Sequence, residues 1–366
     1  MQNMTILRIV QYVNRHTLWL DGIKKQLSLD KFATSILART PTKKKIQGII
    51  SQAKTDTLTR RLRRLEQAGL KHPDIYILGA ECMGDVIAME PIGRYVKACV
   101  PAGKINWIIR ECFADIFKHA PFIDQLIPVR SLSEGYDLLM QESDKPNSIT
   151  INCHMDGTGC AVTKRIIRNP INPQINFFSY YSIGTLLNAF SLAAGLPMLD
   201  EDPVFYLSPN EQPPLHLNDP YIVIQCHSND KNRDWSNEKW NELATRLMKE
   251  GYLVVEIGMP RTIQMNNPLY QDFTGKKNLQ QVAHLIHSAA LFIGIDSGFA
   301  HFAHALKTPS VVLLGKYAHY DRYTPYAGTF TNGNLFHIIR AKQGHYAATI
   351  TTQNVFEQCQ STLHLK

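Results

Sequence analysis

The chain has 366 residues, of which 44% are hydrophobic and 19% are charged, and this balance excludes an intrinsically disordered protein. Its length exceeds what one ordinary hydrophobic core supports and predicts two domains. No stretch approaches the ~18 uninterrupted apolar residues of a membrane-spanning helix. The N-terminus also lacks the apolar core and cleavage site of a signal peptide, so we expect a cytoplasmic protein.

Positive charge is concentrated near the N-terminus. Residues 1–70 hold 14 Lys and Arg against 4 Asp and Glu, a net charge of +10, whereas the other residues carry −2. We expect residues 1–72 to form a basic, mainly helical extension centred on KKK (43–45) and RRLRR (60–64). Such runs are usually solvated helix faces. The alternatives are contact with an anionic membrane or an acidic acceptor. Nucleic acid is disfavoured, because no aromatic residues interleave with the charges.

A first α/β domain is predicted over residues 73–207. Short apolar runs predict strands at 74–80, 105–110, 123–129 and 148–153. Helices are predicted at 84–99, in a segment ending at 117, and at 182–195. Pro91 either kinks the first of these helices or lies in its first turn, and Gly195 followed by Leu-Pro ends the last.

A polar stretch with four prolines, residues 208–220, is predicted to link this domain to a second one over residues 221–345. Strands are predicted there at 221–226, 252–258, 291–295 and 310–315, and helices at 237–250, 279–288 and 298–306. The C-terminal segment 346–366 contains an amphipathic stretch, which we expect to pack back on the first domain.

Strands and helices therefore alternate in two halves, and the strands are almost continuously apolar. This pattern predicts an α/β protein with two doubly wound, Rossmann-like parallel sheets. Ligands of such sheets bind at the carboxyl ends of the strands, and two facing domains form a cleft there. Glycosyltransferases, epimerases and dehydrogenases all use this architecture, so the fold alone does not decide the function.

The seven cysteines include no Cys-x-x-Cys pair, which favours neither a disulfide framework nor a zinc ribbon. Only Cys153, His154 and Cys160 lie close together in sequence, and two thiols with one histidine give a weak signal for metal binding. We expect most cysteines to be buried small hydrophobic residues, and we expect no metal site.

The first candidate site is Gly84-Asp85, where the first strand of the first domain meets its helix. The pair is compatible with a turn followed by a helix N-cap, because Asp accepts hydrogen bonds from free helix amides. Alternatively, Asp85 is a carboxylate held at the cleft as a general base. Gly79 and Gly84 lie five residues apart and form no Gly-x-Gly-x-x-Gly dinucleotide motif.

The second candidate site is the polar loop 227–235, which precedes a predicted helix. It contains the hydroxyl of Ser228, the amide of Asn229 and two cations, one of them Arg233. Hydroxyl and amide donors, a guanidinium fork and a positive helix end suit a phosphate or diphosphate. An ordinary polar loop has the same composition.

The third candidate site is Asp296-Ser297-Gly298, between an apolar strand and an alanine-rich helix. Asp296 can cap that helix, while Ser297 and Gly298 leave backbone amides available to an anion. The helix also carries His301 and, one turn later, His304. From periodicity alone, such histidines are more often packed structural residues than ligand contacts.

Several segments together resemble glycosyltransferase family 9, the ADP-heptose:lipopolysaccharide heptosyltransferases. They are MGDVIAMEP, SLAAGLPMLDEDPVFYLS, WSNEKWNEL and FTGKKNLQQVAHLIHSAALFIGIDSGFAHFAHALKTPSVVLLG. The resemblance covers residues 73–345, and residues 1–70 have no counterpart in the family. It implies a GT-B fold and inverting transfer of heptose from a nucleotide diphosphate, with no metal or other cofactor.

The resemblance also implies roles for individual residues. Asp85, next to Gly84 in the substrate-side loop, would deprotonate the acceptor hydroxyl. Arg233 stands where the family has a lysine, which keeps the charge but changes the geometry, and Asn229 is a partial departure. The implied donor-binding residues are Ser228, Asn229, Arg233, Lys276, Lys277, Asp296, Ser297, Gly298 and His301. His304 lies outside the motif and is expected to be structural.

The implied reaction is a direct displacement at the anomeric carbon. Asp85 strengthens the nucleophile, Arg233 and the amides at Ser297 and Gly298 stabilise the leaving diphosphate, and domain closure brings the two sides together. We therefore expect transfer of heptose from ADP-heptose to a lipopolysaccharide-type acceptor. The enzyme is expected in the cytoplasm, where the basic extension can hold it at the inner face of the membrane, recognise the acceptor or mediate oligomerisation.

Three alternatives stay open. One is a family member that uses another nucleotide sugar or modifies a protein or other polysaccharide. Members that modify autotransporters carry a C-terminal cysteine cluster for iron, whereas this chain has only Cys359 there. The second is a sugar-nucleotide epimerase, against which Asp85 argues. The third is a non-catalytic binding module, which the departures at Asn229 and Arg233 leave open.

Overall fold

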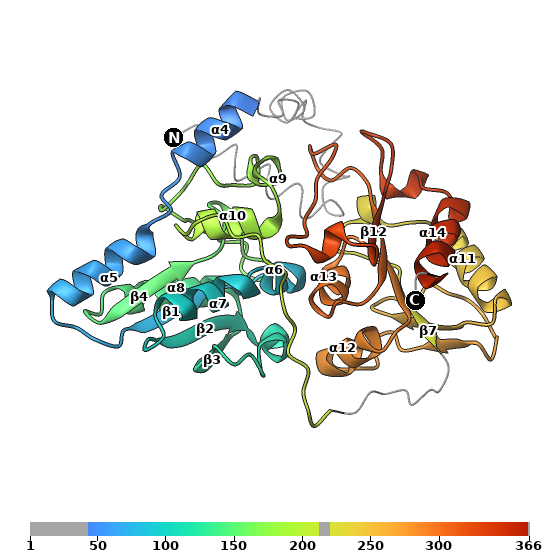
Figure 1. Cartoon of the computed structure of the whole chain (residues 1–366), viewed down its shortest axis with the longest axis horizontal. Helices are drawn as coiled ribbons and strands as arrows, with labels where there is room; N and C mark the ends of the chain where they lie inside the picture. The colour runs from blue at the N-terminus through green and yellow to red at the C-terminus, as the bar shows by residue number, and fades with distance from the viewer. Residues whose placement is uncertain (1–42, 212–219, 365–366) are drawn as a thin grey trace.

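The computed structural model describes residues 43–211 and 220–364 (Figure 1). Residues 1–42 of the predicted extension, residues 212–219 of the predicted linker and residues 365–366 lie outside the described ranges. Within those ranges, no helix is long and apolar enough to cross a membrane.

The first sheet has four parallel strands in the order β3-β2-β1-β4. Its strands are β1 (Asp74–Leu78), β2 (Lys104–Arg110), β3 (Gln125–Val129) and β4 (Ser148–Asn152). Ile75 and Ile77 of β1 face one apolar cluster, which includes helix α7 (Glu90–Cys99), while Leu78 faces another, which includes helix α8 (Leu132–Ser143). Helices therefore cover both faces, as predicted for a doubly wound sheet.

The second sheet has six parallel strands in the order β12-β11-β10-β7-β8-β9. They are β7 (Tyr221–Gln225), β8 (Leu253–Ile257), β9 (Tyr270–Asp272), β10 (Leu291–Ile295), β11 (Ser310–Leu314) and β12 (Phe336–Arg340). Every residue of β7, β8, β10 and β11 is buried, because helices such as α11 (Asn237–Lys249) and α12 (Leu279–His287) pack on the sheet. The predicted α/β protein with two parallel sheets is confirmed.

Two helices predicted as continuous are each divided in the structure. The first becomes α6 (Met83–Ala88) and α7, and Pro91 lies in the first turn of α7, where its missing N–H has no helical partner to lose. The second becomes α9 (Tyr180–Ile183) and α10 (Leu186–Ala193). A capping box between Thr185 and Asn188 starts α10 and explains this break.

Part of the basic N-terminal segment packs on the first domain. Helix α4 (Lys43–Ser51) is followed by α5 (Thr57–Gln67), and Leu58 of α5 is 5% exposed within the core of that domain. The guanidinium of Arg61 donates to the carbonyl oxygen and to the hydroxyl of Thr150 on the edge strand β4. Helix α5 therefore covers an edge of the first sheet, as sheet edges in soluble proteins often require.

The C-terminal helix α14 (Thr352–His364) packs on the second domain, so the prediction that residues 346–366 return to the first domain is wrong. Its buried Cys359 belongs to the same apolar cluster as Trp240 of α11. The hydroxyl of Thr352 also donates to Oε2 of Glu242 on α11 at 2.8 Å. Amphipathic spacing identified a buried face on this segment but carried no information about which domain it contacts.

The chain crosses between the domains along residues 197–211, which run between the two halves of the molecule in Figure 1. The backbone N–H of Ser208 donates to Oε1 of Gln280 on α12 at 2.9 Å. Nε2 of Gln280 in turn donates to the carbonyl oxygen of Asp115 in the first domain at 2.9 Å. The crossing thus begins before residue 208, N-terminal to the predicted linker.

The packing of α5 predicts that Leu58→Ala lowers the free energy of unfolding by about 2–5 kcal/mol, because it leaves a cavity in the core of the first domain. Urea denaturation of the full chain measures this change. Arg63→Ala, on the exposed side of the same helix, is the matched control and should change the value by less than about 0.5 kcal/mol. An unchanged midpoint for Leu58→Ala would mean that α5 contributes nothing to the domain.

Candidate functional site

Helices α6 and α13 (Gly298–Ala305) meet where the two domains face each other (Figure 1). A Cβ atom added at Gly84 of α6 would lie 2.8 Å from Cδ2 of His301 on α13. One added at Gly298 would overlap the side chain of Met83. Glycine at both positions therefore permits the close approach. Because each helix follows the carboxyl end of a strand, this contact joins the two sheet edges at which ligands bind.

Asp85 lies in the first turn of α6, one residue after this contact. Tyr181 of α9 lies within electrostatic reach of Asp85 and of Asp296 in the second domain. Burial, most of all, and the charges of these two carboxylates raise the pKa of the Tyr181 phenol well above its usual value. One predicted site carboxylate from each domain therefore acts electrostatically on the same tyrosine.

Asp296, which follows β10, is 3% exposed and forms an ion pair with Arg233, whose side chain is 20% exposed. Nη1 of Arg233 donates to its Oδ2 at 3.1 Å, and the Tyr323 hydroxyl donates to the same oxygen at 2.6 Å. The Tyr326 hydroxyl donates to Oδ1 at 3.4 Å. The N-cap residue of α13 is Ser297, so the prediction that Asp296 caps this helix is wrong. The carboxylate instead binds a guanidinium and two phenols.

Arg233 retains hydrogen-bonding capacity beyond this pair. Burial by itself lowers the pKa of Arg233, but Asp296 and the surrounding tyrosines outweigh that effect and raise it, so the guanidinium stays charged. Its Nε is buried and has no hydrogen-bond partner among the described residues. An unsatisfied buried donor costs about 1–3 kcal/mol, so the site favours a ligand oxygen at this point.

The side chain of the N-cap residue does not cap the N-terminus of α13. The hydroxyl of Ser297 donates to Oε1 of Gln225 at 2.7 Å and makes no capping bond to α13. Gln225, the last residue of β7, thus fixes the start of α13 and is a site residue that sequence reasoning missed. The first amides of α13 carry the positive end of the helix dipole and suit an anion.

The loop 227–235 is organised by Asp234, which sequence reasoning also missed. Its Oδ1 accepts a hydrogen bond from the backbone N–H of Ser228 at 2.9 Å, and its Oδ2 lies 3.2 Å from Nδ1 of His227. The hydroxyl of Ser228 donates to the carbonyl oxygen of Asp230 at 2.8 Å. Asn229 is exposed. The Ser228 side chain is therefore engaged within the loop, whereas that of Asn229 faces solvent.

His301 is 4% exposed and packs against Gly84 and against Tyr326, whose ring centroid lies 4.8 Å from its own. Burial lowers the pKa of His301 to about 4, partly opposed by Asp296, so the imidazole is neutral at neutral pH. A neutral ring can exchange hydrogen bonds with a sugar hydroxyl without adding charge. His304, one turn further along, instead contacts Asp202, with its Nε2 3.2 Å from Oδ1.

Lys276 and Lys277 lie between β9 and α12. Nζ of Lys276 forms an ion pair with Oδ2 of Asp272 at 2.6 Å, and Nζ of Lys277 lies 5.0 Å from the centroid of the Phe273 ring. Within the described residues, no hydrogen bond or ion pair joins either lysine to the Arg233–Asp296 pair. The structure does not bring these two predicted residues to the ion pair.

Tyrosines from both domains surround the Arg233–Asp296 pair. The loop after β11 carries a tyrosine at every third position, in the sequence YAHYDRYTPY (317–326). The ring centroid of Tyr181 lies 4.5 Å from that of Tyr323 and 5.4 Å from that of Tyr320. Sequence reasoning missed this cluster, although the regular spacing was visible in the sequence.

No group of three or more His, Cys, Asp and Glu side chains is placed to hold a metal ion within residues 43–211 and 220–364. The sequence cluster Cys153, His154 and Cys160 is not assembled into one. Nε2 of His154 accepts a hydrogen bond from the backbone N–H of Ala80 at 3.0 Å, and both thiols are buried.

Sequence comparison identifies relatives over part of the chain. Residues 180–347 match glycosyltransferase family 9 (heptosyltransferase). Lipopolysaccharide heptosyltransferase 3 of Escherichia coli (strain K12) is 31% identical over 116 residues, which cover 29% of this chain and 33% of that protein. Autotransporter heptosyltransferase Aah of Escherichia coli is 32% identical over 138 residues, which cover 33% of this chain and 34% of that protein. The matches span about a third of the length of these curated relatives.

Structural comparison covers more of the chain. The structure of Escherichia coli ADP-heptose LPS heptosyltransferase II is similar at a TM-score of 0.58 and 19% identity, over 80% of this chain and 99% of that one. At this identity the likeness concerns the fold, and it confirms the expected GT-B-like arrangement of two parallel sheets. Residues 180–347 therefore belong to glycosyltransferase family 9, the heptosyltransferase family, and the chain shares the two-sheet fold of a solved heptosyltransferase.

Proposed function

We propose that this chain is an inverting glycosyltransferase that moves heptose from ADP-heptose to a hydroxyl of a lipopolysaccharide-type acceptor. One observation carries the proposal. Through the contact of Gly84 with His301, the carboxylate-bearing turn of α6 lies against the helix that begins beside the Arg233–Asp296 pair. A base from one domain and an anion-binding helix end from the other therefore belong to the same site.

In the proposed reaction, the acceptor oxygen attacks the anomeric carbon as its bond to the diphosphate breaks. Asp85 takes the proton from the attacking hydroxyl, and the nucleoside diphosphate leaves with the bonding electrons. The Arg233–Asp296 pair has no net charge, so stabilisation of the diphosphate depends on the unmatched Nε of Arg233 and the first amides of α13. Ser228, Asn229, Lys276 and Lys277 are proposed as further donor contacts, at positions that the family resemblance implies.

The donor is proposed from the relatives. The Escherichia coli protein of similar structure is an ADP-heptose heptosyltransferase, which supports ADP-heptose here. Neutral His301, which lies against α6, can exchange hydrogen bonds with a sugar hydroxyl, and the Asp296 carboxylate can accept one. Thermal stabilisation by ADP-, GDP- and UDP-sugars tests this choice, because a ligand that binds only the folded state raises its stability. A second assay must then detect ADP released from ADP-heptose in the presence of an acceptor. If none of the nucleotide sugars raises the stability of the chain, a non-catalytic binding module is favoured.

The acceptor has two candidates. Similarity to a lipopolysaccharide heptosyltransferase supports a glycolipid, whereas similarity to an autotransporter heptosyltransferase favours a protein. We propose the glycolipid, because basic side chains lie on the acceptor side of the molecule. Helix α4 packs beside α9, which carries Tyr181 near Asp85.

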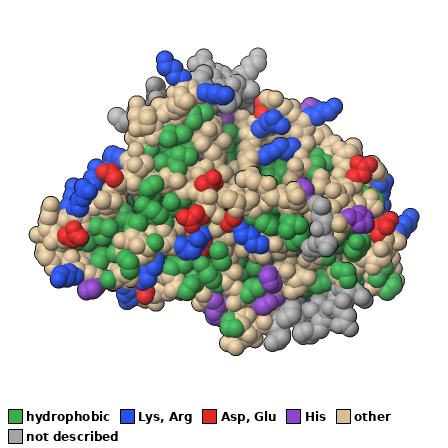
Figure 2. Space-filling view, viewed as in Figure 1, with side chains coloured by type: hydrophobic (Ala, Val, Ile, Leu, Met, Phe, Trp, Pro, Cys, Tyr) green, Lys and Arg blue, Asp and Glu red, His purple; other side chains and the backbone are tan. Residues whose placement is uncertain are grey.

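A basic surface on α4 and α5 supports association with an anionic membrane. Figure 2 shows Lys and Arg side chains at the top and along the left edge of the view, where Figure 1 places these helices. We call this set of exposed side chains the basic face; it consists of Lys43, Lys44, Lys45, Lys54, Arg60, Arg63 and Arg64. Such a face is attracted to anionic lipids by about 1 kcal/mol for each Lys or Arg near the surface.

The role of Asp85 predicts that Asp85→Asn lowers kcat by at least about a hundredfold, since the amide cannot accept the acceptor proton. The dissociation constant for ADP, measured by calorimetry, should change less than about twofold, because the nucleotide site lies in the other domain. A large loss of ADP binding would assign Asp85 to the donor site instead.

The role of Arg233 predicts different effects for two substitutions. Arg233→Lys should keep the stability of the chain, because the charge opposite Asp296 remains, but it loses the Nε donor and should raise the donor KM; Arg233→Met should raise the donor KM at least about tenfold. Arg233→Met also leaves Asp296 buried without its cation, which costs about 3–5 kcal/mol of stability. Steady-state kinetics and thermal unfolding measure both effects, and an unchanged donor KM for Arg233→Met would exclude this residue from donor binding.

The basic face predicts membrane binding that depends on charge. Replacing Arg60, Arg63 and Arg64 by Gln should reduce co-sedimentation with phosphatidylglycerol vesicles at least about tenfold at low salt, and added salt should weaken binding of the unmodified chain. Triple replacement of exposed cations elsewhere, Arg130, Lys164 and Arg165, is the matched control. Equal binding by both triple variants would contradict the proposal.

A further inference from the structure

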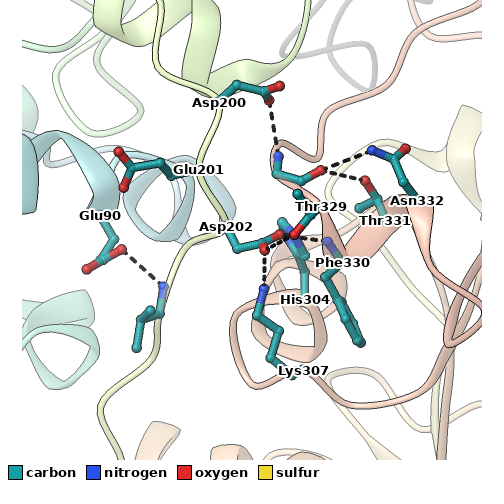
Figure 3. Close-up of polar contacts among 12 residues, drawn as sticks. Glu90, Asp200, Glu201, Asp202, His304, Lys307, Thr329, Phe330, Thr331 and Asn332 are labelled. Carbon is teal, nitrogen blue, oxygen red and sulfur yellow. Dashed lines mark hydrogen bonds and ion pairs between the residues drawn. The ribbon is translucent and has the colours of Figure 1, made fainter.

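A short acidic segment lies between the two domains beside the candidate site. We call residues 200–206 the strap; they run past α7 of the first domain and α13 of the second. Figure 3 shows Glu90 on one side of the strap and His304 and Lys307 on the other. Each side is held by its own set of hydrogen bonds.

The first-domain side of the strap is anchored on Glu90, which is fully buried at the start of α7. Nε of Arg94 donates to both carboxylate oxygens, at 2.9 and 3.1 Å. The backbone N–H of Val204 donates to Oε2 at 3.0 Å, and the Tyr206 hydroxyl donates to Oε1 at 2.9 Å. Arg94 also donates to the carbonyl oxygen of Asp202 at 2.7 Å. The strap is thus tied to the helix that directly follows α6.

The second-domain side is anchored by the carboxylate of Asp202. Its Oδ1 contacts Nε2 of His304 at 3.2 Å and accepts from the backbone N–H of Phe330 at 3.1 Å. Its Oδ2 accepts from Nζ of Lys307 at 2.7 Å and from the hydroxyl of Thr329 at 3.1 Å. One carboxylate therefore joins the C-terminal end of α13 to residues 329–330.

The strap and residues 328–330 approach each other closely. Gly328 has φ +82°, and a Cβ atom there would overlap the side chain and backbone N of Asp202. Its backbone N–H donates to Oδ1 of Asp200 at 3.1 Å. The burial of Asp202 would raise the pKa of its carboxyl, but the donors from His304 and Lys307 outweigh this and lower it far below its usual value. Asp202 therefore stays ionised and keeps its contacts at every pH near neutrality.

We propose that Asp202 is a positioning residue that sets how far α13 lies from α6, and so how far the donor site lies from Asp85. The proposal rests on the proposed function. On one side, the strap is fixed to α7, whose Glu90 follows Asp85 by five residues. On the other side, Asp202 holds His304, one helical turn after His301. Both contacts are made through Glu90 and His304 rather than through Asp85, Arg233 or the first residues of α13, so the role that we assign to Asp202 is to position these elements.

Asp202→Ala tests this role in the full chain. It should lower kcat at least about tenfold, because a shift of about 1 Å between reacting groups is enough for such a loss. The dissociation constant for ADP should change less than about twofold, since Arg233 and the start of α13 are untouched. Asp202→Asn, which keeps the side-chain size and one acceptor oxygen, should lose less activity than Asp202→Ala. Asp137→Ala, which removes an exposed ion pair with Arg165, is the matched control and should retain wild-type kcat.

Each outcome decides the proposal. Loss of kcat with ADP binding retained, graded from Asn to Ala, supports it. Wild-type kcat in both variants overturns it, and so does parallel loss of kcat and ADP binding. If Asp202→Ala does not fold, Asp202→Asn and Lys307→Met are compared with the unmodified chain instead. Loss of kcat with ADP binding retained again supports the proposal, and wild-type kcat again overturns it. If the unmodified chain transfers no sugar, the proposed function fails. Backbone hydrogen exchange then tests the strap alone, and unchanged exchange rates in α6 and α13 for Asp202→Ala overturn its positioning role.

Discussion

The arrangement of the site depends on the close approach of α6 and α13. Neither Gly84 nor Gly298 can carry a Cβ atom without moving His301 or Met83. The contact is local, but it sets the relation of two whole sheets, because each helix begins at the carboxyl end of a strand in its own domain. This approach brings the turn of α6 that carries Asp85 against α13. The same contact buries His301 and keeps its imidazole neutral.

The charge distribution of the site follows from burial. A lone buried carboxylate beside a diphosphate would repel it, but Arg233 neutralises Asp296 and two tyrosine hydroxyls donate to its oxygens. An anion is therefore attracted by directed N–H donors rather than by a net positive charge. These donors are one unmatched guanidinium N–H and the first amides of α13. In surroundings enclosed by tyrosine rings, such fixed dipoles act more strongly than they would in water.

The sequence predicted the fold class, because the alternation of apolar strands with helices can be recognised without knowing how the side chains pack. It also indicated Asp85, Arg233 and Asp296, since each lies between the carboxyl end of a strand and the body of the helix that follows it. It failed wherever the answer depended on a partner far away in the chain. Asp296 was expected to cap α13, but Arg233 and Tyr323 hold it, and α14 was assigned to the wrong domain. Asp202 carried no local signal at all, because its partners lie about 100 residues away.

The placement of α14 has a consequence for how the molecule is divided. Since this helix closes the core around Trp240 within the second domain, the described chain passes between the domains a single time. The second domain therefore contains its own sheet, both helical layers and its terminal helix within one continuous stretch of sequence. Such a unit can fold without waiting for a returning segment. Relative motion of the two domains is therefore restrained by side-chain contacts and by one covalent connection. A C-terminal segment that returned to the first domain would have added a second connection beside it.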